Sequence, residues 1–214
     1  MSAAREDGLL QRALASAYDG AIGRAERAGL GAWRGELLGG IEGTVLELGP
    51  GTGLNLPHYG GGVEQLFLAE PAAHMRGRLR ARLVERGLPG EVLPVSARKV
   101  PLPDGSVDVV VATLLLCSVR QVEQTLATIR RLLRPGGRYI FIEHVGATPG
   151  GTTRRLQHLV EPLWRQVSGD CRLTRDTEAT LQAAGWRFER LLRDPIPGAP
   201  GLVSPAIRGV ARPA

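Results

Sequence analysis

The stretch VLELGPGTG, residues 45–53, decides the fold of this chain of 214 residues. A β-prone run ends at Leu48, and glycines then alternate at positions 49, 51 and 53. Glycine has no Cβ, so it allows a sharp backbone turn and lets a ligand lie directly against the main chain. The stretch therefore predicts a strand that enters a ligand-binding turn.

Two acidic residues narrow the choice of ligand. Glu47 comes just before the turn, and Glu70 follows a second β-prone run, 21 positions after Gly49. A dinucleotide fingerprint needs its third glycine at position 54, where this chain has Leu54. A carboxylate at 47 repels a pyrophosphate and favours the cationic end of an amino acid, whereas one at 70 can accept hydrogen bonds from both hydroxyls of a ribose. The pair predicts a positively charged nucleoside rather than a nicotinamide dinucleotide.

Strand-like and helical segments alternate along the rest of the chain, without an internal repeat or a linker. This alternation predicts an α/β fold with a doubly wound, mostly parallel sheet. We expect a helical extension over residues 1–40 and one domain over residues 41–214. Gly29 and Gly31 should end or loosen the first helix, and Pro135-Gly136-Gly137 should stop the fourth. The expected strands cover 44–48, 65–69, 91–95, 107–112, 138–145, 186–192 and 202–211, and the expected helices cover 9–30, 32–38, 72–86, 122–133, 152–167 and 174–184.

The charge balance is basic, with a net charge of +6 and a pI of about 10.3. Lys99 is the only lysine, so the cations are almost all arginine. One interpretation is attraction to nucleic acid or an anionic membrane; the other is an arginine-rich composition spread over solvated faces. We favour the second, because no block of like charges stands out and aromatic residues for stacking on bases are scarce at 4%. A nucleic-acid partner is therefore not expected.

The cysteines and the apolar runs indicate where in the cell the protein is expected to be. Cys117 and Cys171 lie far apart and match no metal-ligand spacing, so we expect no metal, structural thiols and a reducing setting. Residues 1–8 carry no signal-peptide core, and the longest apolar run, 109–117, is far below the roughly 18 residues that span a bilayer. We expect a soluble, cytoplasmic protein.

Four stretches together resemble the class I S-adenosylmethionine-dependent methyltransferases. They are residues 47–53, Glu70-Pro71, the run PDGSVD at 103–108 and the run LRPGG at 133–137. The resemblance covers roughly residues 40–146. It implies a Rossmann-like, seven-stranded sheet with an antiparallel last strand, S-adenosylmethionine as the cofactor and a small-molecule methyl acceptor.

A narrower similarity links the chain to the alkyl thiol methyltransferase (methyltransferase-like) group within that family. It is carried by TLLLCSV at 113–119, EHV at 143–145, EPLW at 161–164, CRLTR at 171–175 and PAIRG at 205–209. This similarity implies S-methylation of small thiols. Animal members have a hydrophobic N-terminal anchor, for which we find no counterpart, and many relatives carry an acid at the position of Ser96 or of Arg98. We therefore expect the Ser96 hydroxyl and the backbone near Ala97 to hold the adenine.

The chemistry asks little of the protein. Methyl transfer from a sulfonium is an in-line displacement, so the protein mainly positions the acceptor and excludes water. A thiol with a pKa near 8.5 needs only modest help from a base.

We predict His144 and His158 as catalytic residues; the alternatives are a strand-end cap for His144 and a surface pair with Glu161 for His158. The predicted cofactor-binding residues are Glu47, Gly49, Pro50, Gly51, Gly53, Asn55, Glu70, Pro71, Met75, Ser96, Ala97, Thr113 and Leu114.

Several alternatives stay open at this point. O- or N-methylation of a lipid or secondary metabolite is the second activity, and a non-catalytic cofactor-binding module is a more remote one. The amphipathic helix over 9–30 has three interpretations: a lid over the cofactor, which we favour, a weak contact with a membrane surface, or a dimer contact. We expect a monomer or a homodimer.

Overall fold

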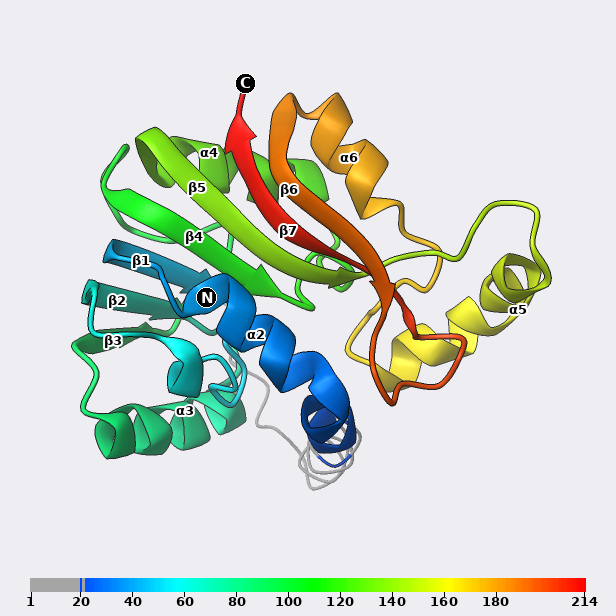
Figure 1. Ribbon diagram of the computed structural model, residues 1–214, viewed down its shortest axis with the longest axis horizontal. Helices are drawn as coiled ribbons and strands as arrows, with labels where there is room; N and C mark the ends of the chain where they lie inside the picture. The colour runs from blue at the N-terminus through cyan, green and yellow to red at the C-terminus, as the bar shows by residue number, and fades with distance from the viewer. Residues whose placement is uncertain (1–19, 21) are drawn as a thin grey trace, which may run out of the picture.

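One seven-stranded sheet runs through the computed structural model in the order β3-β2-β1-β4-β5-β7-β6 (Figure 1). The structure describes residue 20 and residues 22–214. Strands β1 to β5 are parallel to one another, and β7 is antiparallel to both β5 and β6, so the expected fold is confirmed. The strands are β1 Gly43–Leu48, β2 Val63–Ala69, β3 Gly90–Leu93, β4 Val107–Thr113, β5 Leu133–His144, β6 Trp186–Pro195 and β7 Pro205–Pro213.

The strand order places a crevice at one edge of the sheet. From β1 the chain builds outward through β2 and β3, and it then returns to the other side of β1 with β4. Loops leave the carboxyl ends of β1 and β4 in opposite directions, and ligands of open α/β sheets bind at such a reversal. The glycine turn of residues 49–53 lies at this position, directly after β1.

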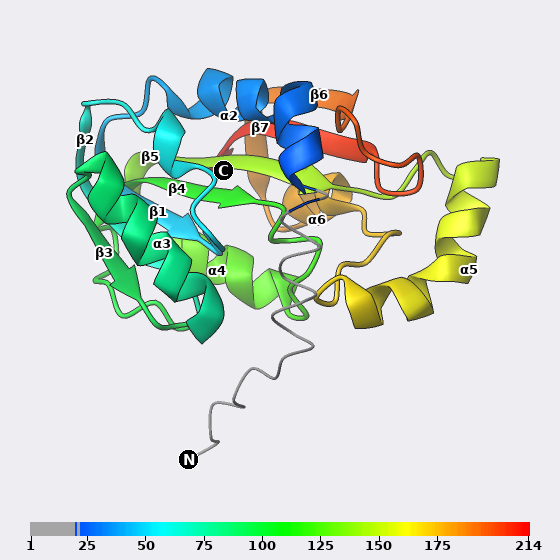
Figure 2. The same ribbon diagram turned by 90° about the horizontal axis from the view of Figure 1, so that it is seen from below.

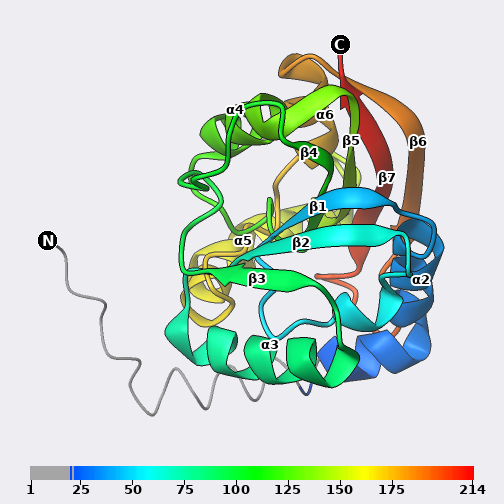
Figure 3. The ribbon, with the colours of Figure 1, turned by 90° about the vertical axis from the view of Figure 1, so that its left-hand side faces the viewer.

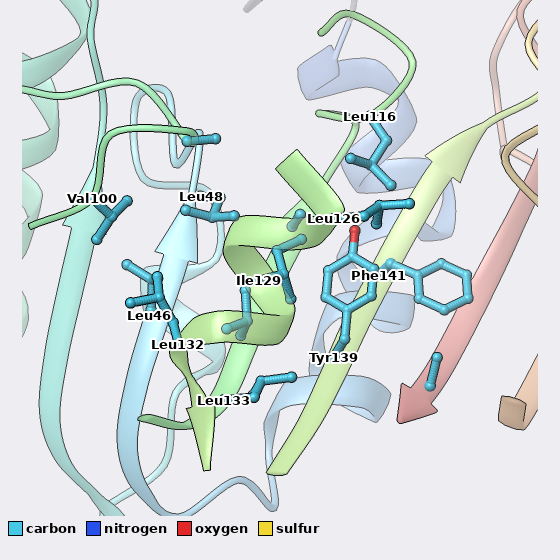
Figure 4. Packing of buried hydrophobic residues seen from close by; sticks show 14 of the residues in the cluster. Leu46, Leu48, Val100, Leu116, Leu126, Ile129, Leu132, Leu133, Tyr139 and Phe141 are labelled. Carbon is cyan, nitrogen blue, oxygen red and sulfur yellow. The ribbon is translucent and has the colours of Figure 1, made fainter. Parts of the chain in front are cut away.

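The sheet is buried on both faces. Val110 and Ala112 of β4 point into one apolar cluster, and Val109 and Val111 point into the other, as the unbroken apolar run predicts. Figure 4 shows the first cluster, where helix α4 (Val122–Leu132) packs on β1 and β5. Helix α6 (Thr177–Ala183) covers the same face. Helices α2 (Gly31–Leu38) and α3 (Ala73–Arg86) cover the other face (Figure 3).

Several element boundaries differ from the sequence-based prediction, and two of these differences have a clear physical cause. The Pro-Gly-Gly run lies inside β5 rather than before it, because Leu133 is already extended and pairs with Val107 ahead of a register shift. Helix α6 begins at Thr177 rather than Thr174, since the carboxylate of Asp176 accepts a hydrogen bond from the N–H of Ala179 and caps the helix there.

The N-terminal extension is described only in part. Residues 1–19 and 21 lie outside the described residues, and they include the first half of the helix expected over 9–30. The described portion continues as a π-helical turn, η1 (Glu26–Leu30), and Gly29 within it has a φ of 141°. Gly29 thus loosens the helix, as predicted, before α2 begins. In the described part of the chain, no helix combines the length and the hydropathy needed to cross a membrane.

Helix α5 (Thr152–Val167) lies beyond the carboxyl ends of β4 and β5, apart from both helical layers (Figure 2). Polar side chains attach it. Gln157 is fully buried, accepts a hydrogen bond from the N–H of Ala147 and donates one to the carbonyl of Leu202. Glu161 accepts hydrogen bonds from the N–H and the hydroxyl of Thr174. The large apolar side chains of this helix that face solvent are Leu156, Leu159, Leu163 and Val167.

Candidate functional site

The glycine turn after β1 is closed on one side and open on the other. A Cβ added to Gly49 would lie 2.7 Å from Cδ1 of Leu115, so the turn packs against the loop that follows β4. Gly51 has a φ of 58°, and a Cβ added there would meet no atom within 4 Å. The backbone at Gly51 therefore borders free space in which a ligand can approach the main chain.

Glu47, near the end of β1, is only 1% exposed. Its Oε1 accepts a hydrogen bond from Nδ2 of Asn55 at 2.8 Å, and its Oε2 accepts one from the hydroxyl of Tyr59 at 2.7 Å. Burial raises the pKa of Glu47, and the two donors oppose that rise. Each carboxylate oxygen keeps a second lone pair, so the group retains acceptor capacity.

A buried arginine from the N-terminal extension completes this network. Arg34 of α2 is 3% exposed, and its Nη1 donates to Oδ1 of Asn55 at 2.7 Å and to Oγ1 of Thr113 at 2.9 Å. Its Nε donates to Glu26 at 2.9 Å. Arg34 therefore joins the extension to the ends of β1 and β4 and fixes the amide orientation of Asn55.

Glu70 links the end of β2 to the glycine turn. Its Oε2 accepts the N–H of Gly51 at 3.0 Å, and its Oε1 accepts the N–H of Ala72 at 2.8 Å. The residue is 6% exposed, and burial raises the pKa of its carboxyl group. The structure thus brings Glu70 to the open side of the turn at Gly51.

The other predicted cofactor-binding residues gather along the same edge. Ser96 and Ala97 line a cavity of about 490 Å³ together with Val119 and Arg120, which places the segment after β3 against the loop after β4. Leu114 has a φ of 56°, and its N–H donates to the carbonyl of Ile142. The remaining predicted positions are buried at Pro50 and Gly53, partly buried at Met75 and exposed at Pro71.

Glu143, at the end of β5, holds the loop after β4. Its fully buried carboxylate accepts the N–H groups of Leu115, Leu116 and Cys117 at 3.2, 2.8 and 3.1 Å. Burial raises the pKa of Glu143 to about 7, and the three backbone donors oppose that rise. The loop that borders Gly49 is therefore tied to β5 by one side chain.

The structure separates the two predicted catalytic histidines. His144 ends β5, is 3% exposed, and its Nδ1 lies 3.9 Å from Sγ of Cys171. Its Nε2 is buried without a hydrogen-bond partner. His158 is exposed on α5, and the glutamate with which the sequence could pair it, Glu161, binds Thr174 instead. Of the two histidines, only His144 lies at a strand end.

Sequence reasoning missed Arg34, Tyr59, the role of Glu143 and the position of Cys171. Arg34 is one of many arginines and carries no signal of its own. The other three act through partners far away in the chain, such as the 28-residue separation between Leu115 and Glu143. A carboxylate in an otherwise apolar strand was the available clue to Glu143.

Comparisons with known proteins agree with this geometry. Residues 46–141 match a family model described as a methyltransferase domain. Human thiol S-methyltransferase TMT1B is 38% identical over 170 residues, which are 78% of this chain and 69% of that protein. Human TMT1A is 36% identical over 171 residues, 78% of this chain and 70% of that protein. A crystal structure of an S-adenosylmethionine-dependent methyltransferase from Mesorhizobium loti superposes with a TM-score of 0.62 at 23% identity, covering 86% of this chain and 97% of the other.

The sheet order and the turn after β1 define a class I S-adenosylmethionine-dependent methyltransferase, and S-adenosylmethionine is its cofactor. The chain belongs to the family that contains the thiol S-methyltransferases TMT1A and TMT1B. The residues present fit this cofactor. Free space borders the main chain at Gly51, and two buried carboxylates with spare lone pairs suit a ligand that carries an ammonium group and a ribose.

The raised pKa of Glu143 predicts a pH-dependent stability. The pKa of Glu143 is 4.5 in the unfolded chain and about 7 in the folded protein, so the folded protein binds this proton more tightly. The stabilisation from protonated Glu143 is therefore complete below about pH 4.5 and is lost as the pH rises through about 7. We expect urea unfolding from pH 4 to 8 to show wild type losing on the order of 3 kcal/mol relative to Glu143→Gln across this window. Parallel profiles for the two proteins would contradict the assignment.

Proposed function

We propose that this enzyme transfers the methyl group of S-adenosylmethionine to the sulfur of a small thiol. The observation that carries the proposal is the similarity, over 78% of the chain, to proteins named thiol S-methyltransferases. The carboxyl ends of β4 and β5 support it, because they bring one buried histidine and two thiols together, and a thiol acceptor needs only modest help from a base.

The proposed cofactor contacts follow the edge of the sheet. Glu47 supplies negative charge for the ammonium group of the methionine part, and Glu70 accepts hydrogen bonds from the ribose hydroxyls. Gly49 to Gly53 leave the backbone bare under the ligand. Ser96 and Ala97 lie at the adenine end, because they line the cavity beside the loop after β4.

On the acceptor side we propose that His144 takes up or orients the thiol proton. S-adenosylmethionine supplies an electrophilic methyl group on a sulfonium, and the acceptor sulfur attacks it in line. The chain's task is to hold that sulfur close to the methyl group and to exclude water. The unpartnered Nε2 of His144, on a residue that is 3% exposed, supports a proton-accepting role.

We also propose that the N-terminal extension, residues 1–40, acts as a lid on the cofactor site. Among its described residues, Arg34 reaches Asn55 and Thr113, both predicted cofactor-binding residues. A segment joined to the site by one buried cation can order the site when it closes.

Both cysteines are free thiols, which supports the cytoplasm as the place of action.

The ribose assignment predicts a loss of cofactor affinity in a Glu70→Ala variant. Removal of a charged hydrogen-bond acceptor should raise the Kd for S-adenosylmethionine roughly tenfold to a hundredfold, measured by isothermal titration calorimetry. Glu64→Ala, an exposed change on the same strand, is the matched control and should leave the Kd unchanged. An unaltered Kd for S-adenosylmethionine in folded Glu70→Ala protein would contradict the proposal that Glu70 binds the ribose.

The lid proposal predicts that Arg34→Ala weakens both the fold and cofactor binding. The change leaves Glu26, Asn55 and Thr113 without their buried cation, so we expect about 3 kcal/mol of destabilisation in urea and at least a tenfold rise in Kd. Arg27→Ala, at an exposed position of η1, should change neither quantity. Unchanged affinity in the destabilised Arg34→Ala protein would contradict a lid that acts through this residue.

The acceptor proposal is tested with matched panels of alkyl thiols, phenols and amines, with the demethylated cofactor as the measured product. We expect kcat/KM for the best thiol to exceed that for any phenol or amine at least tenfold, because a thiol ionises near pH 8.5. Faster methyl transfer to a phenol or an amine than to any thiol would contradict the proposal that a thiol is the methyl acceptor.

The same assay separates the histidines. His144→Gln should lower kcat/KM for thiols at least tenfold while the cofactor Kd stays the same, whereas His158→Gln, at an exposed position, should change kcat/KM less than twofold. Equal losses in the two variants would contradict the selective role of His144.

A further inference from the structure

Two cysteines that are 54 positions apart in the sequence meet at the carboxyl ends of β4 and β5. Cys117 lies in the loop after β4, is 2% exposed, and its thiol interacts with the thiol of Cys171. Cys171 lies in the segment between α5 and α6 and is partly exposed. On its other side, Nδ1 of His144 lies 3.9 Å from the Cys171 sulfur. Three separate elements thus surround one sulfur atom.

Backbone contacts hold the two cysteines together. The N–H of Arg172 donates to the carbonyl of Cys117 at 2.9 Å, so the main chains adjoin. The guanidinium of Arg175 binds the carbonyls of Leu116 and Val119, and Glu143 accepts the N–H of Cys117. The pairing of the thiols is therefore built into the docking of the segment on the loop.

The two thiols differ in character. The interaction with Cys117 lowers the pKa of Cys171, and the hydrogen bond with His144 lowers it further, against the effect of burial. The same interaction between the two thiols, together with burial and the nearby Glu143, raises the pKa of Cys117 far above its usual value. Cys171 is thus the thiol that ionises more readily, and Cys117 is the thiol that stays protonated. A partly exposed thiolate beside a second thiol is the arrangement of redox-reactive cysteines.

We propose that Cys117 and Cys171 form a reversible intramolecular disulfide when a hydroperoxide oxidises Cys171. The Cys171 thiolate attacks the peroxide O–O bond, forms an S–O bond and releases hydroxide, which leaves a sulfenic acid. The Cys117 sulfur then attacks the Cys171 sulfur, the S–O bond breaks, and the oxygen leaves as water with the thiol proton. Two electrons pass from the two sulfurs to the peroxide, and one proton, that of the Cys117 thiol, leaves the protein because Cys171 reacts as the thiolate.

The bond would connect the loop after β4 to the segment between α5 and α6. This location makes the disulfide a modification of the acceptor end, and its formation does not depend on which acceptor the enzyme methylates. His144 loses its thiolate neighbour when the bond forms.

Mass spectrometry of the full-length chain tests the proposal directly, because Cys117 and Cys171 are its only cysteines. Reduced protein is treated with hydrogen peroxide, alkylated and digested with trypsin without a reductant. We expect a loss of two hydrogens and a cross-linked pair of peptides, 100–120 and 166–172, which dithiothreitol separates. Full alkylation of both cysteines after the peroxide treatment, or a disulfide only between two chains, would overturn the proposal.

Two single variants test the assigned order of events. Cys117→Ser should stop at a sulfenic acid on Cys171 that dimedone traps, whereas Cys171→Ser should leave Cys117 unmodified. The pH profile of Cys171 alkylation by iodoacetamide should have its midpoint below about 7, compared with about 8.5 for a free cysteine. Faster oxidation of Cys117 than of Cys171, or a midpoint near 8.5, would contradict the thiolate assignment. Circular dichroism of each variant verifies that it is folded.

Discussion

Buried carboxylates at one edge of the sheet are the constraint around which the site is arranged. A negative charge removed from water is costly unless donors surround it, and each of the three glutamates solves this problem with groups from another element. Glu47 accepts hydrogen bonds from the side chains of Asn55 and Tyr59. Glu70 accepts them from the backbone N–H groups of Gly51 in the turn and of Ala72 just before α3. Glu143 accepts them from three consecutive N–H groups after β4. The carboxylates therefore fix the loops that border the site.

The periodicity of the sequence predicted most of the fold, because strand burial and glycine turns are local properties. The apolar run over 107–112 became β4, and the helix over 152–167 was placed with its observed ends. The Pro-Gly-Gly run misled the prediction since its place inside β5 depends on pairing with β4, a contact no local pattern encodes. The positions of Glu47 and Glu70 were predictable because Glu47 comes just before the end of β1 and Glu70 directly follows β2.

The hydrogen-bond partners within the site were not predictable in the same way. Arg34 reaches across 79 positions to Thr113, and nothing in its neighbourhood distinguishes it from the other arginines. Cys171 was expected to be structural because its spacing from Cys117 matches no motif, yet the docking of one loop on another places the two thiols in contact. Charge and reactivity at this edge arise from tertiary contacts between elements that the sequence keeps far apart.

The polar attachment of α5 has a consequence for which substitutions this helix tolerates. Because Gln157 and Glu161 hold the helix through backbone and hydroxyl groups, its solvent-facing leucines contribute little to the interior of the domain. Substitutions on that surface should therefore cost little free energy of unfolding. Loss of the buried Gln157 amide, by contrast, would detach the first turns of the helix from the two backbone segments that it joins.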